Sequence, residues 1–145
     1  MHIPNTLQSD RLIGYALLRI TLGINISLHG VSRLLAGISQ FANGLVGMFH
    51  QTFLPGWLVG MFGYTLPWME TTTGVLVLFG LCTRFGLITG ALLIFVLTFG
   101  TALRQDWNTA GLQLTYALTF AALLFLRDWN KLSVDGWLER SRKEN

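Results

Sequence analysis

Charged residues are scarce in this chain: Asp, Glu, Lys and Arg make up 12% of its 145 residues, about half the share of an ordinary soluble domain. A soluble domain of this length needs polar side chains over a large surface, yet hydrophobic residues make up 52% here. The composition therefore argues against a soluble globular domain and against a disordered chain. It favours an integral membrane protein.

Ligands for redox cofactors are sparse as well. Cys82 is the one cysteine, which excludes an internal disulfide and any multi-cysteine metal site. No two histidines lie at matching depths on two apolar segments, and no metal-ligand spacing or nucleotide-binding loop occurs. We therefore expect neither a haem nor a metal ion.

Long uncharged stretches indicate where the chain crosses a bilayer. No Asp, Glu, Lys or Arg occurs from Phe85 to Leu103 or from Trp107 to Leu126, and each stretch is close to the about 20 residues that a spanning helix needs. The segment from Trp57 to Cys82 is apolar except for Glu70. The sequence predicts one all-α domain over residues 1–145, an integral membrane four-helix bundle. Its transmembrane helices are expected at about 12–35, 57–82, 85–103 and 110–126.

The segment between the first two predicted spans, residues 37–54, is too polar and too rich in glycine to cross the membrane. Apolar residues such as Phe41, Leu45 and Met48 recur there at helical spacing, which predicts a short interfacial amphipathic helix. Arg11 followed by apolar residues resembles the start of a signal peptide. Because Arg19 interrupts the apolar run and no small-residue cleavage site follows, we expect no cleavage.

The cations predict the orientation. The side that holds both termini would carry seven of them: Arg11, Arg84, Arg127, Lys131, Arg140, Arg142 and Lys143. Only Arg33 and Arg104 would lie on the other side. Cytoplasmic loops carry an excess of Lys and Arg, so we expect both termini in the cytoplasm. The net charge of +3 then reflects topology, and no nucleic-acid partner is expected.

Polar side chains inside the predicted spans are the candidates for function, because ionisable groups are costly there. One stripe of the first predicted helix, about a third of its circumference, carries its polar residues: Arg19, Asn25, His29 and Arg33. Glu70 is the only acid inside the predicted spans. Arg19 is its expected ion-pair partner, with Asn25 or His29 as the other groups within reach.

The second and fourth predicted helices add aromatic and amide side chains near the depth of His29. Gln113 and Tyr116 lie three residues apart on the fourth helix, and Trp68 precedes Glu70 on the second. A pocket lined by these residues would have hydrogen-bond donors at its ends and aromatic walls, which suits a quinone head group. The alternative is that the same side chains form ion pairs and packing contacts that hold the helices together.

Short motifs in a fixed order resemble the DoxX/DoxD-like family. They are Leu18–Gly23, His29-Gly30, Arg33-Leu34, Pro55-Gly56, Glu70, Gly74, Leu78–Leu81, Thr83-Arg84, Leu114–Leu118 and Leu132–Asp135. The resemblance covers nearly the whole chain. It implies a four-helix protein of the bacterial or archaeal cytoplasmic (inner) membrane, related to the membrane subunit of a thiosulfate:quinone oxidoreductase.

Together, the pocket and the resemblance imply a membrane subunit of a quinone-linked oxidoreductase, which binds a quinone head group in the outer half of the bundle. His29 and Glu70 are the expected catalytic residues, and the expected quinone-binding residues are Arg19, Asn25, Arg33, Trp68, Gln113 and Tyr116. Electrons would come from a soluble or membrane redox partner subunit, because the chain has no redox-metal ligands. Besides the lipid bilayer, a homo-oligomer is a further expected contact. A non-catalytic anchor or assembly subunit of a redox complex and a small transporter are the alternatives.

Overall fold

The computed structural model describes residues 5–144, and every regular element in that range is helical. The elements are α1 (Asn5–Met48), α2 (Gly56–Phe79), α3 (Thr83–Leu103), α4 (Trp107–Phe125), the 3-10 turn η1 (Arg127–Trp129) and α5 (Val134–Glu144). The single domain expected over residues 1–145 includes residues 1–4 and 145, which lie outside the described residues.

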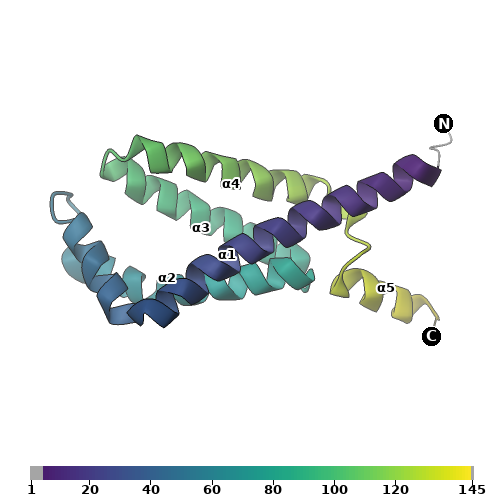
Figure 1. The fold of residues 1–145 in the computed structure, drawn as a ribbon, viewed down its shortest axis with the longest axis horizontal. Helices are drawn as coiled ribbons and strands as arrows, with labels where there is room; N and C mark the ends of the chain where they lie inside the picture. Colours follow the sequence, from purple (N-terminus) through teal and green to yellow (C-terminus); the bar gives the residue numbers. More distant parts are fainter. Residues whose placement is uncertain (1–4, 145) are drawn as a thin grey trace.

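Two helix pairs make up the body of the molecule (Figure 1). Helices α3 and α4 lie side by side as an antiparallel pair, and α1 packs along α2. The start of α1 and the whole of α5 lie at the same end of the molecule. We call this the α5 end.

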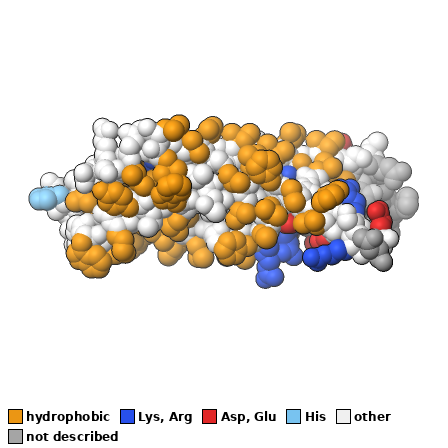
Figure 2. All heavy atoms as spheres, turned by 90° about the horizontal axis from the view of Figure 1, so that it is seen from below, with side chains coloured by type: hydrophobic (Ala, Val, Ile, Leu, Met, Phe, Trp, Pro, Cys, Tyr) orange, Lys and Arg blue, Asp and Glu red, His pale blue; other side chains and the backbone are white. Residues whose placement is uncertain are grey.

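The exterior is that of a membrane protein. Large apolar side chains such as Leu17, Phe95 and Leu118 are 61%, 70% and 71% exposed, and Figure 2 shows apolar side chains along the length of one face. Among residues 5–144, two helices, Thr6–Met48 and Thr83–Leu103, are long and apolar enough to cross a membrane. Helices α2 and α4 fall short of that criterion because polar residues such as Glu70 and Gln113 lower their hydropathy. The prediction of an all-helical, membrane-type protein is confirmed at this level.

The predicted four-helix bundle is wrong, because residues 5–144 form five α-helices. The short helix predicted between the first two spans is present. Gly37 has non-helical backbone angles (φ 105°, ψ 107°), which glycine adopts without strain, and it divides α1 into two helical segments. That the second segment lies at the membrane interface stays a prediction. Residues 38–48, which we call the arm, pack against α2: Ala42 is 0% exposed and contacts Gly63. The arm is therefore a separate helical segment, and it packs back against α2.

A single hydrophobic core joins the four long helices. Its buried members are Tyr15, Leu22, Ile26, Val77, Leu87, Ile94, Phe120 and Leu123. They come from α1, α2, α3 and α4, so that each helix turns one apolar side inward and the other outward.

Close approach of two backbones fixes how α1 crosses α2. A methyl group on Gly30 would collide with the Pro67 carbonyl oxygen and the Thr71 backbone nitrogen, and one on Gly74 would collide with the Ser27 backbone. Small residues at a helix interface allow this proximity, as they do between membrane helices. The register of α1 against α2 is therefore set by backbone contact.

The predicted polar turn between the third and fourth helices is short. Asp106 caps α4 by accepting a hydrogen bond from the Thr109 backbone N–H at 3.1 Å. Hydrogen bonds from Thr109 lower the pKa of the Asp106 carboxyl. The carboxylate is thus held in its charged form beside Arg104, whose guanidinium lies 3.6 Å away.

Candidate functional site

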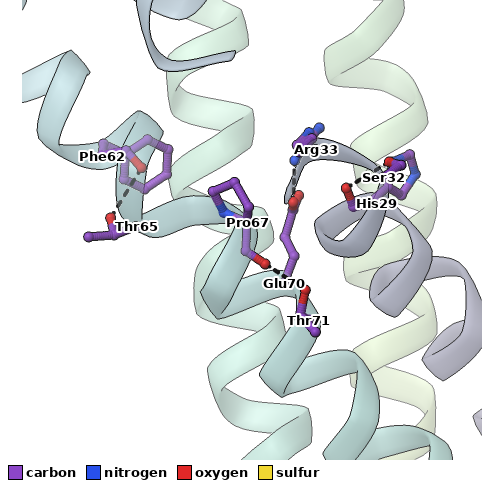
Figure 3. Close-up of polar contacts among 8 residues, drawn as sticks. All are labelled: His29, Ser32, Arg33, Phe62, Thr65, Pro67, Glu70 and Thr71. Carbon is purple, nitrogen blue, oxygen red and sulfur yellow. Dashed lines mark hydrogen bonds and ion pairs between the residues drawn. The ribbon is translucent and has the colours of Figure 1, made fainter. Parts of the chain in front are cut away.

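Glu70 forms an ion pair with Arg33 between α2 and α1 (Figure 3). The Glu70 residue is 4% exposed, and the Arg33 guanidinium also lies 4.8 Å from the centre of the Phe41 ring on the arm. The prediction that Arg19 pairs with Glu70 is wrong. Helices α1 and α2 run antiparallel, and Gly30 lies against Pro67 and Thr71. The long side chain of Arg33, one turn beyond Gly30, reaches Glu70 on the facing turn of α2.

Arg19 instead caps the end of α2. It is 2% exposed, and it donates hydrogen bonds to the carbonyl oxygens of Val77 at 2.7 Å and Leu132 at 2.9 Å, and to that of Leu78. The last carbonyls of a helix have no partner within it, and a cation beside them is favourable. Arg19 therefore ties α1, α2 and the segment before α5 together.

Asp135, which the sequence did not mark as a site residue, holds the turn between α2 and α3. Its carboxylate accepts hydrogen bonds from the backbone N–H groups of Cys82 at 2.9 Å and Thr83 at 2.7 Å, and its own N–H donates to the Gly80 carbonyl at 3.0 Å. Nearby, the Asn130 amide donates to the Thr83 hydroxyl at 2.8 Å. These partners are distant in sequence, so no local sequence pattern predicts the contacts between them.

A side-chain hydrogen bond at Asn25 joins α1 to α4. The Tyr116 hydroxyl donates a hydrogen bond to the Asn25 side-chain oxygen at 3.0 Å. Beside this contact a shallow groove of about 170 Å³ opens between the two helices, with Thr21 and Thr115 among its lining residues. Asn25, Thr21 and Thr115 are all exposed in the single chain.

The remaining predicted residues lie elsewhere. Gln113 accepts a hydrogen bond from the Thr101 hydroxyl at 2.8 Å, Trp68 is 60% exposed, and His29 is exposed on α1, one turn before Arg33. The structure brings Asn25 together with Tyr116 and Arg33 together with Glu70. Neither Gln113 nor Arg19 is hydrogen-bonded to either pair. The catalytic roles of His29 and Glu70 stay predictions.

These contacts define a helical, membrane-type protein whose embedded charges bind partners within the same chain. A family model described as methylamine utilisation protein MauE matches residues 14–113. This match covers more than half of the chain, which therefore belongs to the MauE family. No curated protein and no solved structure matches the chain. The predicted resemblance to the DoxX/DoxD-like family is wrong, because the family model that matches is that of MauE. The motifs behind the resemblance are at most six residues long, too short to separate two families of membrane helices.

Proposed function

We propose that the chain is a non-catalytic membrane subunit that anchors or assembles a redox complex used in methylamine utilisation. The observation that carries this proposal is a contrast between the charged and the uncharged polar side chains of α1. The charged side chains between α1 and α2 bind within the chain, since Glu70 pairs with Arg33 and Arg19 donates hydrogen bonds to backbone carbonyls, whereas uncharged polar side chains of α1 are exposed. The first feature suits a scaffold, and the second suits a surface that a partner covers.

The outward polar side chains form one row along α1. Thr21, Asn25 and His29 are spaced four residues apart, which places them on one face of the helix, and all three are exposed. We call them the polar stripe. A polar group that faces hydrocarbon is costly, while hydrogen bonds between membrane helices satisfy such groups. The proposed occupant of the stripe and the neighbouring groove is a transmembrane helix of a partner subunit.

The proposed topology has both termini in the cytoplasm of a bacterial or archaeal cell, with the protein in its cytoplasmic membrane. The start of α1 and the helix α5 lie at one end. Basic residues gather near the same end (Figure 2). An excess of Lys and Arg on one side of the membrane is typical of the cytoplasmic side.

A quinone-linked subunit is the second candidate. The observation that favours it is the groove of about 170 Å³ at the Asn25–Tyr116 contact, where two polar side chains meet a surface open to lipid. Such a site would require the Asn25–Tyr116 hydrogen bond to open toward a quinone carbonyl. A catalytic Glu70 would also have to leave Arg33, at the cost of an uncompensated buried charge.

Affinity purification of the full chain in a gentle detergent tests the proposal. We expect a stoichiometric partner protein with the wild type, and about a tenfold lower yield of it with the double variant Asn25→Leu and His29→Leu, because two interhelical hydrogen bonds are lost. Thr72→Leu, at an exposed position of α2, is the matched control and should retain the partner. Stoichiometric quinone that the double variant loses, with no protein partner in the wild type, would reject the anchor function in favour of the quinone site.

A further inference from the structure

We propose that a groove at the α5 end binds the head group of an anionic phospholipid, whose acyl chains lie along α3. The groove runs between the α2–α3 turn, η1 and α5, and has a volume of about 790 Å³. Helix α3 is long and apolar enough to cross a membrane, and it begins at Thr83 in the groove wall. The groove therefore lies at the expected level of the lipid head groups.

Basic side chains outnumber acidic ones in the wall of the groove. Four basic residues line it: Arg84, Arg127, Lys131 and Arg142. Two of its three acids are already engaged, since Asp135 accepts two backbone hydrogen bonds and Glu139 lies 3.6 Å from Lys131. Within residues 5–144 no ion pair engages the three arginines, and the carboxylates of Asp128 and Asp135 only partly offset them, which leaves one positive charge in excess. The charge left over suits a phosphate.

Apolar side chains continue the groove onto the outer face of α3. Leu81, Phe85 and Ile88 line it and are 40%, 62% and 37% exposed, and Leu138 of α5 faces it at 40% exposed. One helical turn beyond Ile88, Leu92 is 60% exposed on the same helix. A row of apolar residues that leads away from a basic cluster matches an amphiphile, with its head at the arginines and its chains along the helix.

Native mass spectrometry of the full chain, with equal amounts of dioleoyl phosphatidylglycerol and dioleoyl phosphatidylcholine, tests this site. We expect bound phosphatidylglycerol in clear excess. A cation near an anionic membrane surface contributes about fivefold to affinity, so Arg84→Gln with Arg127→Gln should lower phosphatidylglycerol binding at least about tenfold. The control Arg140→Gln with Lys143→Gln removes the same charge from α5 outside the groove, and it should change binding less than about threefold.

Three results would overturn the site: equal binding of the two lipids, equal losses in the two double variants, or displacement of phosphatidylglycerol by excess inorganic phosphate. The last would show that the groove recognises free phosphate and not a lipid. Circular dichroism verifies that the variants fold. If the first double variant does not, Arg142→Gln, at an exposed position of α5, must still lower phosphatidylglycerol binding by about fivefold, and unchanged binding would reject the proposal.

Discussion

Glu70→Gln is expected to lower the stability of the folded protein by about 3 kcal/mol, because it leaves the Arg33 cation without its partner between two helices. The double variant Arg33→Gln with Glu70→Gln removes both charges and should be milder than Glu70→Gln alone. A double-mutant cycle on the thermal unfolding of the detergent-solubilised protein measures the coupling. We expect a coupling of more than about 1 kcal/mol.

A second cycle on the same two helices is the control. Arg19 donates to carbonyl oxygens at the end of α2 and makes no contact with Glu70, so Arg19→Gln and Glu70→Gln should give additive losses. Additivity in the Arg33–Glu70 cycle, or strong coupling in the Arg19–Glu70 cycle, would show that the ion pair has been assigned to the wrong arginine.

Gly30→Ala is expected to cost about 3 kcal/mol or more, since overpacking at a rigid contact is among the costlier core changes. The added methyl group would meet the Pro67 carbonyl and the Thr71 backbone nitrogen, and backbone atoms in a helix cannot step aside. Helix α1 would have to move away from α2, which would also stretch the Arg33–Glu70 pair.

Gly111→Ala is the matched control for this substitution. Gly111 lies within α4, and nothing lies within 4 Å of the position where its methyl group would go. Alanine is favoured over glycine in a helix by about 0.5–1 kcal/mol, so Gly111→Ala should melt at the same temperature as the wild type or slightly higher. If Gly30→Ala had the same melting temperature as Gly111→Ala, the close crossing of α1 and α2 would be wrong.

The helical segments were within reach of sequence reasoning, because runs without charge mark them directly. The predicted third helix, 85–103, agrees with α3, and the predicted fourth helix, 110–126, overlaps most of α4. The helix break at Gly37 was also predicted, because the segment after it is polar and rich in glycine. The packing of that segment against α2 was not predicted. The contact of Ala42 with Gly63 turns the arm against α2, and two small residues far apart in sequence give no local signal of such a contact.

The choice of partners for the polar residues was harder to foresee than their positions. Arg19 was expected to pair with Glu70 because both are charged groups inside the predicted spans, but the sequence specifies no register between the two helices. The register follows from the Gly30–Pro67 contact, which brings Arg33 to Glu70 and leaves Arg19 at the last carbonyls of α2. A polar stripe read from one helix therefore predicts which side chains need partners but not which partners they find.

Photo-crosslinking in native membranes tests the central claim, that the polar stripe of α1 is a docking surface for another protein. Benzoylphenylalanine replaces Asn25 on the stripe in one variant and Phe95, 70% exposed on α3, in the other. We predict that irradiation yields a discrete protein adduct from position 25 and none from position 95, where the probe meets lipid. Protein adducts absent from position 25, or equally abundant from both positions, would contradict the account.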